Sequence, residues 1–147
     1  MNNKPQLSWD QETMIAKCEI NYKGQVFCGE AVCHPDDRDV ASQYTGYTIA
    51  GHRALINCLR FVRDFEVKPQ LKSLNQLYYS MKNSKHFNPK SYEAIMLYKQ
   101  IHHLEKTLQA VAEEIQAQKA YIKEYIKKKE TDFIKIRAIY AKRAKND

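Results

Sequence analysis

A seven-residue repeat of apolar side chains between Leu97 and Tyr125 constrains the fold of this chain more than any other feature. The repeat alternates steps of three and four residues, and only Gln118 interrupts it. Because a 3.5-residue period keeps one helical face against a neighbour, it predicts a long helix packed along a second one. The apolar positions, called the seam below, are Leu97, Ile101, Leu104, Leu108, Val111, Ile115, Ile122 and Tyr125.

The partner of the seam is expected to be the helical segment that precedes it. This first helix should begin near Thr48 as its N-cap and reach Met81, with a kink or a restart at Pro69. The second helix should start at Pro89, capped by Asn88, and continue almost to the end of the chain. At 1.5 Å per residue, the second helix then outruns the first by about 30 Å. The expected apolar stripe of the first helix is Leu55, Leu59, Val62 and Phe65.

A β-hairpin is predicted ahead of the helices. Residues 14–22 alternate between apolar and polar side chains, and residues 25–33 read as the returning strand after a turn at Lys23 and Gly24. Gly29 inside the second strand indicates a bulge or a close approach of another backbone. Residues 1–8 are expected to be a loose lead-in.

The predicted fold class is α+β and mostly α. A lone hairpin is marginally stable in water, so its apolar face must pack on the helices. We therefore expect a β-hairpin with a polar loop over residues 1–47, packed on a long antiparallel, coiled-coil-like helical hairpin over residues 48–147 as one structural unit.

Composition narrows the protein class further. The chain has 147 residues, 44% hydrophobic and 28% charged, which is not the composition of a disordered tail. No apolar run of eighteen residues occurs, and the first residues lack the apolar core of a secretory signal. We expect a cytoplasmic protein, in the host cytoplasm if a phage encodes it, with four reduced cysteines.

The net charge of +7 is concentrated at the C-terminus, where ten Lys or Arg face four acids from Lys119 onward. A basic arm of this kind attracts phosphate or an acidic protein surface, and the alternative is an ordinary solvated helix face. The predicted anion-binding residues here are Lys127, Lys128, Lys129, Arg137 and Arg143.

The apolar residues beyond Glu124 leave the phase of the seam. We call the part of the second helix that extends beyond the first, from about Glu124 onward, the overhang. It must cover the hairpin, bend back or meet another subunit. We expect a homo-oligomer, most simply a symmetric dimer. The predicted interface residues are Ile126, Phe133, Ile136 and Tyr140.

Two further groups suit an anionic ligand. Arg53, Asn57 and Arg60 share one helical face, and guanidinium groups bind phosphate or carboxylate in a bidentate manner. Lys85 and Phe87 in the connector combine charge with an exposed ring, which suits a nucleotide. The alternatives are intrahelical pairing with nearby acids for the first group and a solvated hinge for the second.

Several site classes are not predicted. Cys28, Cys33 and His34 lack the paired Cys-x2-Cys spacing of strong zinc sites. The polar residues from His34 to Asp39 fit turns better than a calcium loop. Without a glycine-rich phosphate loop or a catalytic constellation, we expect no enzyme, no catalytic residue, no metal and no cofactor.

Several segments carry a family resemblance: Cys33-His34-Pro35-Asp36-Asp37, Thr48-Ile49-Ala50, Lys68-Pro69-Gln70-Leu71 and Phe87-Asn88-Pro89-Lys90-Ser91-Tyr92. With these segments the chain resembles small accessory proteins of phages and mobile elements in Gram-positive bacteria. The resemblance implies a non-enzymatic protein that acts on host machinery, including antiviral defence. The hairpin-then-helix order is also similar to part of a double-stranded-RNA-binding fold, but without its third strand and its lysine cluster at the helix start.

The predicted function is therefore a self-associating binding protein with an anionic partner. It would inhibit host defence by occluding a host protein or by sequestering a nucleotide signal. The alternative is a DNA- or RNA-binding accessory factor that uses the basic C-terminal helix.

Overall fold

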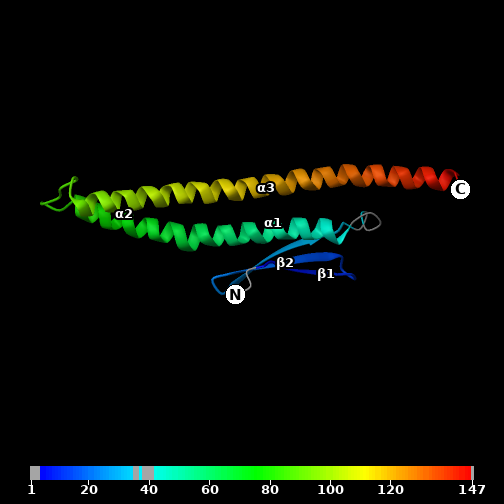
Figure 1. The fold of residues 1–147 in the computed structure, drawn as a ribbon, viewed down its shortest axis with the longest axis horizontal. Coiled ribbons are helices and arrows are strands. Elements are labelled where there is room, and N and C mark those ends of the chain that lie inside the picture. Colours follow the sequence, from blue (N-terminus) through cyan, green and yellow to red (C-terminus); the bar gives the residue numbers. More distant parts are fainter. Residues whose placement is uncertain (1–3, 35–36, 38–41, 147) are drawn as a thin grey trace. The chain divides into compact units, whose positions relative to one another are not determined.

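The computed structural model describes residues 4–34, 37 and 42–146, which divide into two compact units. Unit 1 is Met1–Cys58 with Gln116–Asp147, and unit 2 is Leu59–Ile115. The class is mostly helical α+β with a helical hairpin, as predicted (Figure 1). The elements are β1 (Gln6–Asp10), β2 (Ile15–Tyr22), β3 (Gln25–Val32), α1 (Gln43–Phe61), the π-helical segment η2 (Val62–Val67), α2 (Lys68–Lys82) and α3 (Tyr92–Asn146).

The sheet in unit 1 is antiparallel and has the strand order β1-β2-β3. The predicted hairpin is confirmed as β2 and β3, and its turn residues Lys23 and Gly24 have φ values of 50° and 80°. Such left-handed pairs match the twist of two-residue hairpins.

The expectation of a loose lead-in is wrong for residues 6–8, which belong to β1. This strand pairs with β2 from Gln6 to Asp10. The Asp10 carboxylate accepts N–H bonds from Glu12 at 2.9 Å and Thr13 at 3.2 Å, which stabilises the turn between the strands. A five-residue strand shows too few alternations to stand out in the sequence. The sheet thus has a third strand in addition to the two that were predicted.

Small residues join the sheet to α1 in unit 1. Ala50 and Ala54 of α1 are fully buried. A Cβ atom on Gly29 would lie 2.2 Å from the Ala50 carbonyl oxygen and 2.3 Å from the Ala54 nitrogen. The predicted close approach of another backbone to Gly29 is thus confirmed, and glycine is required there because any side chain would collide with helix backbone.

Two details of the first helix differ from the prediction. The helix begins at Gln43, and the Ser42 hydroxyl accepts the N–H of Thr45 at 3.2 Å, so Ser42 rather than Thr48 caps it. In the expected apolar stripe, Phe65 is 70% exposed. The deepest burial on α1 falls on small side chains, which hydrophobicity patterns weight little.

Pro69 explains the π-helical segment in unit 2. Proline lacks an N–H and its ring clashes with the carbonyl four residues earlier. Before Pro69 the helix adopts the wider π-helical form over η2, and the Lys68 N–H donates to the Arg63 carbonyl. The α-helix then begins again as α2, with Pro69 in its first turn. The restart at Pro69 was one of the two predicted outcomes.

The start of α3 lies slightly later than predicted. The Asn88 side chain accepts the N–H of Lys90 at 3.0 Å and forms a turn instead of a helix cap. Ser91 takes that role, since its hydroxyl accepts the N–H of Ala94 at 3.3 Å. Within α3 the seam is confirmed by the burial of Leu97, Ile101, Ile115 and Ile122.

In unit 1 the overhang covers the region of the sheet and α1. Ile126 and Phe133 of α3 line a cavity with Trp9 of β1 and Ile49 of α1. The interruption of the seam also has a partner there, because Gln118 forms a hydrogen bond with the ring of His52. No helix in the described part of the chain has the length and apolarity to span a membrane.

Candidate functional site

The C-terminal part of α3 carries the densest positive charge in the chain. Between Tyr125 and Asn146 the sequence has eight Lys or Arg and two acids. Lys128, Lys135 and Lys142 follow each other at intervals of seven residues, and all three are exposed. Seven residues are two helical turns, so their Cα atoms repeat along one face every 10 Å or so. With Lys127 and Lys145 they form what we call the cationic face.

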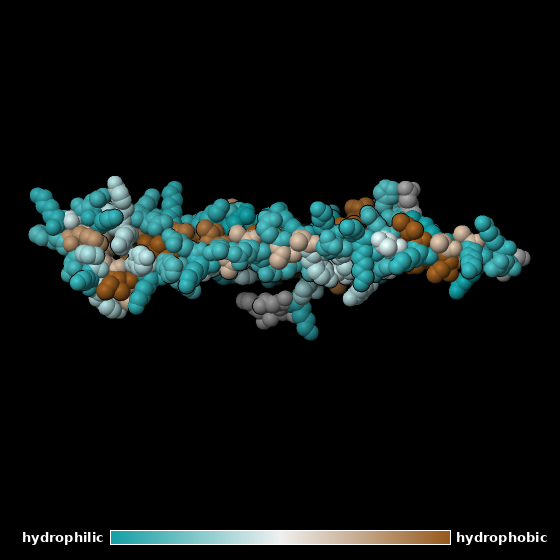
Figure 2. Space-filling model, turned by 90° about the horizontal axis from the view of Figure 1, so that it is seen from above, coloured by the Kyte–Doolittle hydropathy of each residue, from teal (hydrophilic) through white to brown (hydrophobic). Residues whose placement is uncertain are grey.

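The side of α3 opposite the cationic face packs against the rest of unit 1. Ile122 is 8% exposed, and Ile126 and Phe133 are half-buried. At 100° per residue these side chains point away from Lys128, Lys135 and Lys142. Packing therefore uses one side of α3 and leaves the lysines in solvent. Figure 2 shows hydrophilic and apolar side chains side by side along this C-terminal part.

Two of the anion-binding residues predicted on α3 have partners within unit 1. The Arg137 guanidinium donates to the Asp37 carboxylate at 2.6 Å. The Lys129 ammonium lies 5.5 Å from the centre of the Tyr125 ring. Lys127, Lys128 and Arg143 are exposed. The prediction omitted Lys135, Lys142 and Lys145, although the seven-residue lysine period that starts at Lys128 could have found the first two.

Arg53 and Asn57 have a structural use that the sequence did not indicate. The Arg53 guanidinium donates to the Glu30 carbonyl at 2.8 Å, and the Asn57 amide donates to the Cys28 carbonyl at 2.7 Å. The β2–β3 register turns these carbonyls toward the open edge of β3. The step of four residues from Arg53 to Asn57 advances about 6 Å along α1. The step of two residues between Cys28 and Glu30 covers about 7 Å along β3, so each side chain reaches one carbonyl.

Arg60 is exposed. The intrahelical pairing considered as the alternative is present at Asp64, which accepts from Arg63 at 2.8 Å and lies 3.5 Å from the Lys68 ammonium. The hydrogen bond from Arg63 lowers the pKa of the Asp64 carboxyl below its ordinary value of 3.8.

The connector does not offer the exposed ring that was expected. Phe87 is half-buried, and its ring packs edge-on against Tyr78 with the centroids 6.1 Å apart. Tyr78 lies 6.4 Å from Tyr98 in turn. Lys85 is exposed beside this cluster.

The predicted oligomer residues differ in exposure. Ile126, Phe133 and Ile136 are half-buried within the chain, whereas Tyr140 is 54% exposed. Ile134 and Ile139 are also exposed on the same helix, at 65% and 51%. At 100° per residue these two isoleucines lie well apart around the helix and do not form one patch.

The cavity that Ile126 and Phe133 line with Trp9 and Ile49 is small. Its volume is about 180 Å³, and charged side chains from Asp37, Lys129 and Glu130 line it together with His34. Pockets for nucleotide-sized ligands measure roughly 300–1,000 Å³. A nucleotide therefore does not fit this cavity.

Cysteine and metal chemistry have little support in the described residues. Burial raises the pKa of the Cys18 thiol, with smaller contributions from Cys28 and Glu19, so the reactive thiolate is disfavoured. Cys28 lies on the opposite, exposed face of the sheet. Among residues 4–34, 37 and 42–146, no group of three His, Cys, Asp or Glu side chains could hold a metal ion. Asp36 and Asp39 of the acidic loop lie outside the described residues.

A scan of protein-family models, a search of curated proteins and a search of solved structures find no match to this chain. The resemblance to phage accessory proteins, the implied action on host defence and the expected self-association therefore stay predictions.

Proposed function

We propose that this chain is a non-catalytic binding protein that holds the phosphate backbone of a nucleic acid on the cationic face of α3. The observation that carries the proposal is the regular, exposed lysine series at Lys128, Lys135 and Lys142. Of the two acids in this part of α3, Glu130 lines the cavity on the packed side. Asp132 is half-buried and lies beside the lysine series, four residues after Lys128 and three before Lys135.

The geometry favours contact with phosphates over the reading of bases. A DNA strand presents a phosphate about every 3.4 Å along the helix axis, so each 10 Å interval between lysines passes several phosphates. Lysine acts as a point charge without the fork that recognises guanine in a bidentate manner. The start of α1 offers no alternative basic surface, since residues 42–52 contain no Lys or Arg. Binding should therefore depend strongly on salt and weakly on sequence.

The test compares two variants of equal net charge. One replaces Lys128, Lys135 and Lys142 by glutamine, and the matched control replaces three exposed lysines of unit 2, Lys72, Lys90 and Lys106. Anisotropy of labelled duplex DNA, single-stranded DNA and RNA is recorded from low to moderate salt.

We expect the first variant to lose about tenfold or more in affinity at low salt, and its salt slope to fall by roughly 2 to 3 because three phosphate contacts are lost. The control should keep the slope of the unmodified chain. Equal losses in both variants would mean that net charge alone attracts nucleic acid, and no binding at low salt would remove the proposal.

A further inference from the structure

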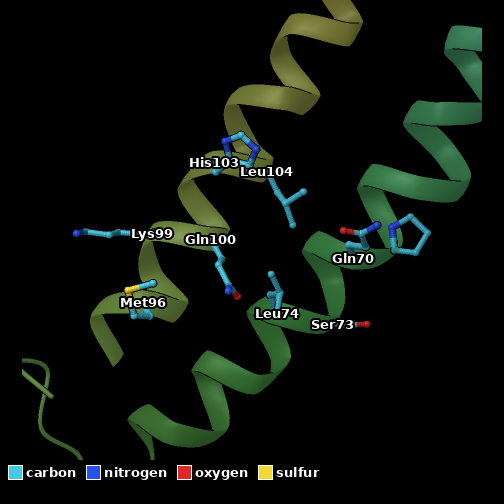
Figure 3. A pocket seen from close by; sticks show the side chains of 9 residues that line it. Gln70, Ser73, Leu74, Met96, Lys99, Gln100, His103 and Leu104 are labelled. Atoms are coloured by element: carbon cyan, nitrogen blue, oxygen red, sulfur yellow. The ribbon is translucent and has the colours of Figure 1, made fainter. Parts of the chain in front are cut away.

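Unit 2 contains a groove that the cationic face does not use. It lies between α2 and the first part of α3 and has a volume of about 740 Å³. Figure 3 shows Leu74 of α2 and Leu104 of α3 pointing into the space between the helices, with Gln100 beside them. Pro69 and Met96 add apolar surface to the lining.

The groove exists because the two helices do not fill the space between them. None of the described α2 residues is fully buried. Leu74 and Leu104 are half-buried, and Met96 is 38% exposed. Apolar side chains left open between two helices gain free energy when a third apolar surface covers them.

The charge around the groove selects the kind of partner. Lys99 and His103 lie one turn apart on the α3 side, whereas Gln70 and Ser73 on the α2 side are neutral. No carboxylate lines the groove, and the sequence from Val67 to Tyr92 has five lysines and no Asp or Glu. An occupant with carboxylates along one edge is complementary to this arrangement.

We propose that the groove binds an acidic amphipathic helix of a protein partner. The lining of α3 extends from Met96 to Leu104, about 12 Å or a little over two helical turns. The partner should therefore insert apolar side chains at positions i, i+4 and i+7, with Glu or Asp one turn apart on the edge facing Lys99 and His103.

Two other occupants fit less well. A nucleic acid would place charged phosphates against the leucines of the floor, and the lining offers a base no Phe, Tyr or Trp ring to stack on. A second copy of this chain carries a charge of +7 and would meet like charge at the groove. The contact is small, so an affinity in the micromolar range is expected.

The experiment uses the full chain and two synthetic helical peptides. The first has leucine at i, i+4 and i+7 with glutamate along both edges, and the second has lysine in place of each glutamate. Titration calorimetry should show the acidic peptide binding with a Kd of about 10–100 μM and the basic peptide about tenfold more weakly.

Charge reversal locates the site. The double variant Lys99→Glu with His103→Glu should bind the acidic peptide about tenfold more weakly and the basic peptide more tightly. The matched reversal of two exposed lysines outside the groove, Lys90→Glu with Lys106→Glu, should stay within about twofold of the unmodified chain. Circular dichroism checks that helix content is unchanged in both variants.

Ser73→Trp provides an independent test by placing a large ring at the groove, and it should abolish peptide binding. Equal affinity for the two peptides, or no effect of the Lys99 and His103 reversal, would overturn the proposal. So would dimers in sedimentation that Ser73→Trp dissociates, because the occupant would then be a second copy. The cationic-face variant should bind the acidic peptide normally, which separates this inference from the nucleic-acid proposal.

Discussion

Helix packing within unit 1 differs from helix packing within unit 2. In unit 1, Ala50 and Ala54 have no exposed surface and lie directly against the sheet at Gly29. In unit 2, α2 buries none of its described residues fully, and Leu74 and Leu104 leave an open groove. Small side chains allow backbones to meet and leave no room for a ligand, whereas paired large side chains hold helices apart. The first contact therefore stabilises the fold, and the second leaves the groove at which we propose that a partner binds.

The largest effect is expected from Gly29→Ala. The added Cβ would lie 2.2 Å from the Ala50 carbonyl oxygen, and helix backbone cannot rotate away as a side chain can. We expect a loss of about 3 kcal/mol or more in the free energy of unfolding of unit 1, measured by urea denaturation.

The control for this substitution is Gly51→Ala, which lies on α1. A Cβ at Gly51 meets nothing within 4 Å, and alanine favours helix, so a gain of about 0.5–1 kcal/mol is expected. A mild effect of Gly29→Ala would show that the sheet and α1 can separate, and the contrast between the units would weaken.

A smaller effect is expected from the side chains at the edge of β3. The double variant Arg53→Ala with Asn57→Ala removes the hydrogen bonds to the Glu30 and Cys28 carbonyls. We expect a loss of about 2 kcal/mol, and faster amide hydrogen exchange in β3 measured by NMR. Arg60→Ala is the control and should change stability by less than about 0.5 kcal/mol. Equal effects of Arg53 and Arg60 substitutions would return Arg53 to the candidate anion site.

The smallest effect concerns two carboxyl groups, one in each unit. Backbone N–H groups of Thr13 and Glu12 lower the pKa of Asp10, and the Arg63 side chain lowers the pKa of Asp64. Both folded values lie below the ordinary 3.8, so each group stabilises the fold above that pH. The contribution is lost as the pH falls through the lower, folded value.

Salt should distinguish these two carboxyl groups. About 1 M salt screens the cationic partners of Asp64, so its pKa should rise toward 3.8 in a carbon-13 NMR titration. The Asp10 value should move less because its partners are neutral amides. Arg63→Gln should reproduce the effect of salt at Asp64, and an equal salt response of both groups would contradict this assignment.

The helical hairpin and the β2–β3 pair were predictable because periodicity reports which side of an element is apolar. The burial of the seam residues Leu97, Ile101, Ile115 and Ile122 shows this directly. The third strand was not predictable, since β1 is too short for its alternation to be distinguished from chance. The buried face of α1 was missed because alanine and glycine carry little hydrophobic signal, although their size determines how closely backbones pack.

The candidate sites likewise combine features set by local sequence with features set by tertiary contacts. Local sequence alone determined the charge of the C-terminal helix, because a run of lysines with few acids is basic in any conformation. Only tertiary structure decided which charges are free, since Arg137 meets Asp37 and Arg53 meets the Glu30 carbonyl from positions distant in the chain. The groove in unit 2 belongs to the second category too, because the space between α2 and α3 depends on how the side chains of both helices fill it.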